Sequence, residues 1–103
     1  MKRLVLLMFV VLAGCGQESD LLQQAIELSQ QSKFDEAKMA YEELLEMDSD
    51  NPLYRNNYGW VLLKLGEYTE AREHLEFAAK HEDKLEGAPR KNLAELASLE
   101  QSN

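Results

Sequence analysis

The chain is poor in the residues that interrupt helices. Its 103 residues include only two prolines and five glycines, so long stretches contain nothing that breaks helical hydrogen bonding. No stretch alternates apolar and polar residues over the length of a strand. Hydrophobic residues make up 45% of the chain and charged residues 29%, which is typical of a globular protein and not of a disordered one. These features predict an all-α fold.

Basic residues are also few. Eleven Lys and Arg stand against 19 Asp and Glu, so the net charge is −8 at pH 7. Proteins that bind nucleic acid carry a basic patch or stripe. The sequence has none, and we expect no nucleic-acid partner. Two explanations of the acidity stay open: a solvated surface, or a preference for a basic protein partner whose encounter the charge would speed.

Side chains suited to catalysis or metal binding are scarce. Cys15 is the single cysteine, so no internal disulfide is possible. His74 and His81 are seven residues apart, whereas metal ligands on a helix usually stand four apart, and we expect both to face solvent. The polar turn at 48–51 lacks the glycine and distal glutamate of a calcium loop. Without a nucleophile elbow or a phosphate loop, the sequence predicts no enzyme activity, no metal site and no cofactor.

The first 20 residues predict export and a lipid anchor. A basic start, Lys2 and Arg3, precedes an almost wholly apolar segment at 4–13. This segment is too short to span a bilayer as a helix but suits a secretory signal. Residues 12–15, Leu-Ala-Gly-Cys, resemble the lipobox of bacterial lipoproteins, which implies removal of residues 1–14 and lipidation of Cys15. The alternative is an ordinary signal peptide, or an uncleaved hydrophobic tail, with an incidental cysteine.

The lipoprotein resemblance also implies a location. In Gram-negative members of that family, aspartate after the lipidated cysteine favours the inner membrane. Gly16 stands there in this chain, which implies the outer membrane, facing the periplasm. In a source without an outer membrane, the anchor would be in the outer face of the cell membrane. Residues 15–20 would form the lipidated cysteine and a short tether. Because 16–20 span at most about 17 Å, the domain is expected to lie near the bilayer.

A repeat of 34 residues organises the rest of the chain. Apolar residues recur at helical spacing, and polar clusters at 30–33 and 48–51 separate them. A fixed period of this length predicts stacked helical hairpins, which we place at 18–51 and 52–85. Residues 86–103 predict one more helix that caps the last hairpin. The pairs that carry the period are Leu28 and Leu62, Phe34 and Tyr68, Glu36 and Glu70, and Ala37 and Ala71.

Both hairpins resemble the tetratricopeptide repeat. In the second, residues 65–71 (Leu-Gly-Glu-Tyr-Thr-Glu-Ala) match a characteristic string of that family, with Gly59 and Ala78 at its small positions. Ser32 replaces the usual turn glycine of the first hairpin, and Arg55 stands where an aromatic is common. The resemblance implies an α-solenoid fragment of two hairpins and a capping helix, acting as a protein-binding module. The corresponding positions of the first hairpin hold Ala25, Phe34, Ala37 and Tyr41.

The same resemblance implies a concave groove lined by the first helix of each hairpin. Trp60 is the strongest candidate for partner contact, because tryptophan is enriched at binding hot spots; alternatively it packs against a neighbouring helix. Leu22 and Ile26 occupy places where other members clamp a terminal carboxylate. We therefore expect an apolar groove for a helix or an extended segment. The predicted groove residues are Leu22, Ile26, Asn56, Trp60, Leu63 and Lys64.

Together these features predict a membrane-anchored lipoprotein that binds another protein or peptide of the bacterial cell envelope. By analogy with other lipoproteins of this repeat family, it would be an assembly factor for a pilus, secretion or outer-membrane complex. The alternative is a structural scaffold of the envelope that self-associates into a homo-oligomer. Repeat arrays usually need about three repeats for stability, so we expect modest stability, to which a partner or a second copy would add.

Overall fold

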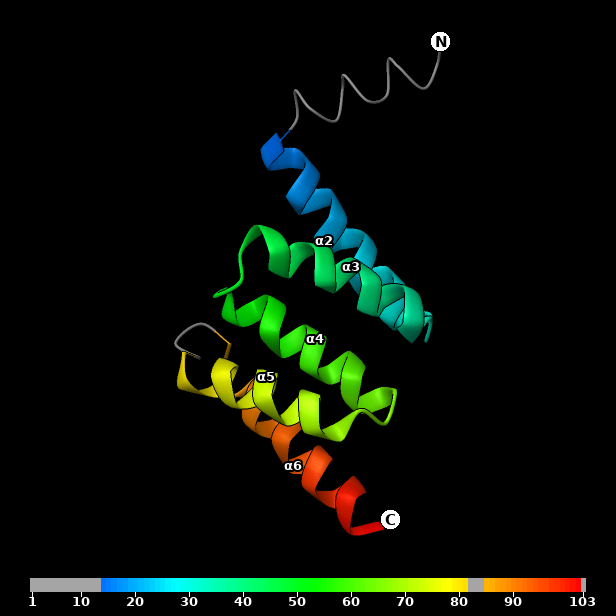
Figure 1. Ribbon diagram of the computed structural model, residues 1–103, viewed down its shortest axis with the longest axis vertical. Helices are drawn as coiled ribbons and strands as arrows, with labels where there is room; N and C mark the ends of the chain where they lie inside the picture. The colour runs from blue at the N-terminus through cyan, green and yellow to red at the C-terminus, as the bar shows by residue number, and fades with distance from the viewer. Residues whose placement is uncertain (1–13, 82–84, 103) are drawn as a thin grey trace.

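The computed structural model describes residues 14–81 and 85–102, with side chains from residue 16 onwards. In this part of the chain all regular structure is helical, which confirms the all-α prediction. The predicted signal peptide lies almost entirely outside the described residues. The helices, stacked one on the next in Figure 1, are α2 (Gly14–Gln30), α3 (Phe34–Met47), α4 (Pro52–Lys64), α5 (Tyr68–Lys80) and α6 (Ala88–Ser102).

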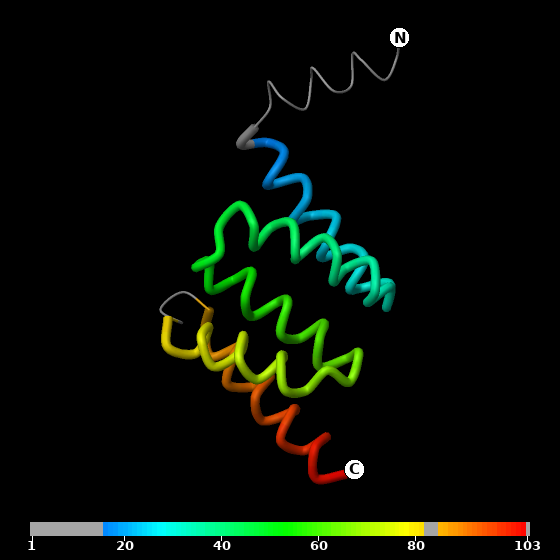
Figure 2. Tube along the Cα trace, viewed as in Figure 1, coloured from blue at the N-terminus to red at the C-terminus, as the bar shows by residue number. Residues whose placement is uncertain are grey.

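The helices form two successive hairpins and a cap, as the sequence predicts. α2 packs against α3, and α4 packs against α5. The hairpins stack through α3 and α4, and α6 continues the stack by packing on α5 and also touching α4. The Cα trace in Figure 2 shows this zigzag order from one end of the body to the other. Each helix therefore contacts the next one in the chain, as in a solenoid.

The turns between helices follow from particular residues. The Asn51 side chain accepts a hydrogen bond from the Tyr54 backbone N–H at 3.1 Å, and Pro52 follows as the first helical residue; this is a favourable helix start. Gly66 follows α4 with a φ of +80°, a left-handed conformation that costs glycine little. Ser32 occupies the same place one repeat earlier with a φ of +61°, where its Cβ makes that conformation costly.

The hydrophobic core runs without interruption through both hairpins into the cap. Tyr41, Leu44, Leu62 and Leu75 are almost fully buried, and so is Leu96 of α6. The burial of Leu96 shows that the last helix belongs to the folded body. The hydrophobic core is therefore shared by the two hairpins and the capping helix α6.

Small residues let the helices of a hairpin approach closely. Gly59 of α4 faces α5 so tightly that a Cβ placed there would lie 2.7 Å from Leu75 Cγ. Ala37 and Ala71, one repeat apart, are both fully buried. The small positions of the repeat therefore set the spacing between helices.

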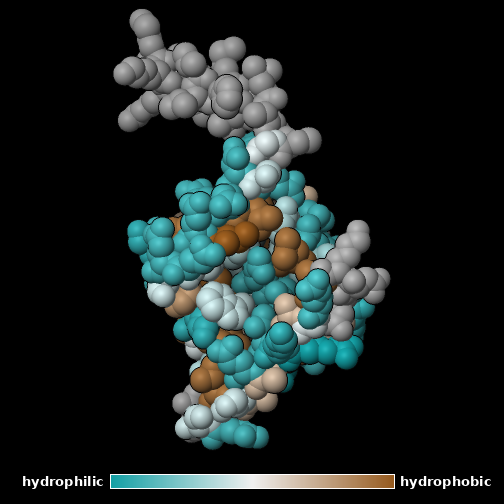
Figure 3. Space-filling view, turned by 180° about the vertical axis from the view of Figure 1, so that it is seen from behind, coloured by the Kyte–Doolittle hydropathy of each residue, from teal (hydrophilic) through white to brown (hydrophobic). Residues whose placement is uncertain are grey.

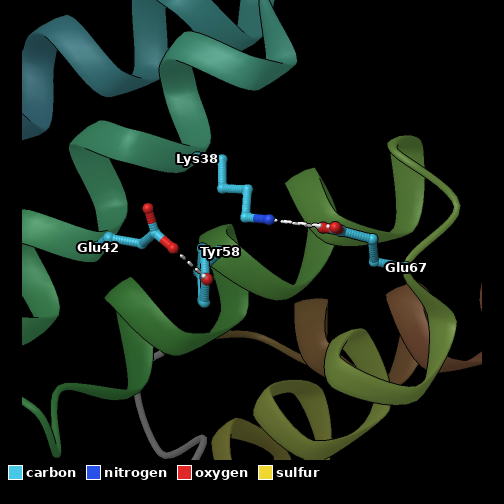
Figure 4. A network of polar contacts seen from close by, with 4 residues as sticks. All are labelled: Lys38, Glu42, Tyr58 and Glu67. Carbon is cyan, nitrogen blue, oxygen red and sulfur yellow. Dashed lines mark hydrogen bonds and ion pairs between the residues drawn. The ribbon is translucent and has the colours of Figure 1, made fainter.

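Figure 4 shows two of the polar contacts that join the first hairpin to the second. Lys38 of α3 forms an ion pair with Glu67 at 3.0 Å, which raises the pKa of the Lys38 ammonium. The Tyr58 hydroxyl of α4 donates a hydrogen bond to Glu42 of α3 at 3.2 Å; burial, followed by the Glu42 charge, raises the Tyr58 pKa. Such partly exposed contacts add little stability each, but their geometry holds one hairpin in register on the other.

The segment predicted as a tether belongs to a helix. α2 runs through residues 16–20, where five residues rise only about 7.5 Å. Glu18 accepts a 2.6 Å hydrogen bond from the Tyr54 hydroxyl of α4. Burial, followed by this contact with Glu18, raises the pKa of Tyr54 to about 12. The folded body therefore begins by Glu18. None of the described helices is both long and apolar enough to cross a membrane.

His74 corrects the expectation that both histidines face solvent. Its ring is half-buried and packs edge-on against Tyr58, with 4.7 Å between ring centroids. Its Nδ1 lies 3.2 Å from Arg55 Nη1, and burial, followed by the Arg55 charge, lowers the His74 pKa. Arg55 also lies 4.4 Å from the centroid of the Phe77 ring, so it packs where the family often has an aromatic. His81 is exposed.

Candidate functional site

A cavity of about 190 Å³ opens between α2, α4 and α6, with α3 at its base. In Figure 1, α3 and α5 pass in front of α2 and α6, so the reverse view in Figure 3 faces the side of α2 and α6. Apolar side chains gather in the upper half of that face, bordered by hydrophilic ones. The cavity is lined by Ile26, Ser29, Gln30, Tyr41, Asn56, Asn57, Trp60 and Asn92.

Three of the six predicted groove residues meet at this cavity: Ile26 from α2, and Asn56 and Trp60 from α4. Lys64 stands beside it, with its Nζ 5.2 Å from the Trp60 ring centroid. Leu22, one turn before Ile26, is half-buried against the core and does not line the cavity. Whether any of these residues contacts a partner stays a prediction.

The prediction that Leu63 lines the groove is wrong. Its side chain is only 1% exposed and belongs to the hydrophobic core. α4 is the central helix of the stack and packs against α3, α5 and α6. Leu63 therefore contributes no side chain to a groove on this face.

Trp60 both packs against a neighbouring helix and lines the cavity. Its ring meets Phe34 of α3 edge-on, with 5.6 Å between centroids and 73° between planes. Lys64 approaches the same ring and is itself held by Glu95 of α6 at 2.7 Å. These contacts hold the indole in place before any ligand arrives, which lowers the entropic cost of binding through it.

A chain of amide hydrogen bonds crosses the cavity wall. Asn92 Nδ2 of α6 donates to Asn56 Oδ1 at 2.9 Å, and Asn56 Nδ2 donates to Asn57 Oδ1 at 3.3 Å. Asn56 is only 6% exposed, so these bonds satisfy an amide that would be costly to bury alone. Burial raises the pKa of the Tyr41 hydroxyl, and hydrogen bonding with Asn57 and Ser29 partly offsets that rise.

The sequence analysis identified Asn56 but not the other polar residues that line the cavity. Asn57 stands three residues before Trp60 on α4, so helical spacing could have placed it on the same face. Asn92 lies 36 residues away from Asn56, and only the packing of α6 brings the two together. Nothing in the sequence pattern distinguished Ser29, Gln30 and Tyr41 as residues that would line a cavity.

The comparisons with known proteins agree with this architecture. The family model described as tetratricopeptide repeat matches residues 22–85, which is more than half of the 103 residues. Searches of curated proteins and of solved structures found no match. The matched span begins within α2 and extends beyond α5. It covers the second hairpin and most of the first, and their period, small positions and turns fit that description. The chain therefore belongs to the tetratricopeptide repeat family.

Proposed function

We propose that this protein is a lipid-anchored lipoprotein that binds another protein of the bacterial envelope at the face formed by α2, α4 and α6. Repeats of this family are typically non-catalytic modules for protein interaction. The observation that carries the proposal is the cavity on that face, where Ile26 and the pre-positioned Trp60 meet. An immobilised aromatic beside an apolar residue is the usual anchor point of an interface.

The charges around the cavity favour an internal segment of the partner over its carboxyl terminus. Lys64 is the cation that touches Trp60, and it is already paired with Glu95. A terminal carboxylate would have to compete with Glu95 for Lys64, whereas an uncharged internal segment meets no such competition. The proposed partner therefore contributes an apolar side chain and neutral main-chain groups.

Lipidation at Cys15 is the second part of the proposal. Because Glu18 is already tied to Tyr54, only residues 16 and 17 would separate the acylated Cys15 from the first residue held by the folded body. The binding face would then work close to a membrane surface. If the source is Gram-negative, Gly16 favours the outer membrane facing the periplasm, where the protein would serve as an assembly factor for an envelope complex.

Metabolic labelling with a palmitate analogue tests the anchor. Cells that produce the wild type should show a labelled, processed band in the membrane fraction. Cys15→Ser should lose the label and the processing. Ser19→Ala, which changes an exposed residue of the same helix, should retain both. Label that persists in Cys15→Ser would refute lipidation at this residue.

Photo-crosslinking in intact cells tests the binding face. A photoreactive amino acid replaces Asn57 at the cavity or, as a control, Glu73 on the exposed side of α5. We expect a discrete adduct with one envelope protein from position 57 and none from position 73, and Trp60→Ala should weaken it. Equal adducts from both positions would contradict the assignment of the face. An adduct with a second copy of this chain would favour a scaffold instead.

A further inference from the structure

None of the described residues that line the cavity is charged, although the protein is highly charged. Thirty residues of the chain are Asp, Glu, Lys or Arg, yet the eight cavity-lining residues are all neutral types. Binding sites for phosphate or carboxylate groups usually present cations, often arginine. The lining therefore favours a neutral ligand.

The same lining is rich in groups that both donate and accept hydrogen bonds. Ser29 and Tyr41 contribute hydroxyls, and Gln30 contributes an amide. The amide chain runs from Asn92 through Asn56 to Asn57, so that the Asn92 oxygen and the Asn57 nitrogen lie at its two ends. Such a set suits a ligand with several hydroxyl or amide groups, each able to act in either direction.

Trp60 adds an apolar, electron-rich surface to this polar set. Its ring is fixed by Phe34 and lines the cavity together with Ile26. Aromatic rings attract groups of partial positive charge to their faces, and the C–H groups on one side of a sugar ring are of that kind. A neutral sugar presents hydroxyls around its edge and C–H groups on its faces, which matches both halves of the lining.

The size of the cavity agrees with one ring of a saccharide. At about 190 Å³ it is smaller than the roughly 300–1,000 Å³ of pockets for drug-sized ligands. An extended peptide is also neutral along its main chain, but its groups recur every ~3.3 Å along a line. Here the amides bond to one another at a single cavity and do not form a row along a groove. We propose that this cavity binds one neutral sugar unit of a glycan, a function that goes beyond the proposed protein binding and would compete with it for Trp60.

Trp60 is the single tryptophan of the chain and so reports directly on the cavity. The full-length protein in detergent is titrated with N-acetylglucosamine and with its β-1,4-linked dimer, and the tryptophan emission is followed. We expect a saturable change with a Kd of about 1 mM for the single sugar and a lower Kd for the dimer. Glucosamine carries a positive charge, which Lys64 beside the cavity would repel. It should therefore bind more weakly than N-acetylglucosamine.

Two cavity variants and one control sharpen the test. Asn92→Ala removes one end of the amide chain, and Gln30→Ala changes an exposed residue whose loss does not threaten folding. Each should raise the Kd, Asn92→Ala by about tenfold. Gln24→Ala, on the exposed outer side of α2, should leave it unchanged. Far-UV circular dichroism verifies the fold of each variant.

The saccharide inference and the proposed protein binding fail separately. Absence of a saturable emission change with either sugar, or binding that both cavity variants leave intact, would overturn the inference. If position 57 still formed a protein adduct, the cavity would be a peptide site and the proposed function would stand. Sugar binding without any protein adduct would support the inference and remove the proposed function.

Discussion

Replacing Gly59 with alanine should destabilise the protein, although alanine normally favours a helix. The new Cβ would lie 2.7 Å from Leu75 Cγ and 2.8 Å from Leu75 Cδ2. Leu75 is fully buried and cannot swing out into solvent. The third nearby atom is a backbone atom, the Ala71 carbonyl oxygen at 3.3 Å. The helices α4 and α5 must therefore move apart to admit one methyl group.

The expected loss is the difference of two effects. Overpacking a close-packed core costs about 1–3 kcal/mol, while glycine-to-alanine in a helix returns about 1 kcal/mol. We expect a net fall of about 1 kcal/mol in the free energy of unfolding. For a domain of this size that corresponds to a fall in Tm of about 4–8 °C. Thermal and urea unfolding, followed by circular dichroism, measure it.

A double-mutant cycle with Leu75→Ala isolates the cause. Leu75→Ala alone should cost about 2–5 kcal/mol, but clearly less in the Gly59→Ala background because the clash is then absent. Gly66→Ala is the control: a Cβ there meets no atom within 4 Å, so its cost is backbone strain and should be the same with or without Leu75. A higher Tm for Gly59→Ala, or additive costs for positions 59 and 75, would refute the reasoning.

Three further predictions follow from single residues. Ser32→Gly should stabilise the protein by up to about 1 kcal/mol, because the left-handed φ of +61° is costly with a Cβ; urea unfolding measures this, and an unchanged midpoint would contradict it. His74 has a lowered pKa, so the native state binds fewer protons than the unfolded state below pH 6.5. The contribution of His74 to stability is therefore fully present well above pH 6.5 and is lost as the pH falls below 6.5 towards the lowered pKa; His74→Gln should flatten this slope, and a slope equal to that of the wild type would exclude His74 as its source. Tyr54→Phe removes the hydrogen bond to Glu18 and should lower the free energy of unfolding by about 1 kcal/mol. Backbone hydrogen exchange at residues 18–22 should become faster; rates equal to those of the wild type would show that the bond does not hold the start of α2.

The hairpins were predictable because their signal is repeated. Phe34 and Tyr68, one period apart, are the first residues of α3 and α5. The polar turns mark where the preceding helices end. The tether predicted at residues 15–20 instead lies within α2, which begins at Gly14. The hydrogen bond that ties Glu18 of this segment to Tyr54 joins residues 36 apart in the sequence, so no local pattern predicts it.

The misplacement of Leu63 has a different cause. Buried residues lie all around α4, from Tyr54 through Gly59 to Leu63 itself. Periodicity identifies the inner face of a helix only when the other face is polar. On a central helix with apolar residues on several sides, it cannot separate the residues of a groove from those of the core. The amide chain of the cavity could not be predicted either, because Asn92 reaches Asn56 only through the packing of α6.

One comparison between the repeats explains why the binding face is short. The stripe of α4 that includes Tyr58, which bonds to Glu42 of α3, is buried, whereas the matching stripe of α2 is hydrophilic and exposed. Another helix pair could therefore not pack on α2 as the second hairpin packs on α3 without burying unpaired polar groups. Within the described residues, this favours a proposed binding face limited to α2, α4 and α6, and with it a compact ligand or a short segment over a long wrapped chain. The matched pairs of α2 and α4 are Asp20 and Tyr54, Gln24 and Tyr58, and Glu27 and Val61.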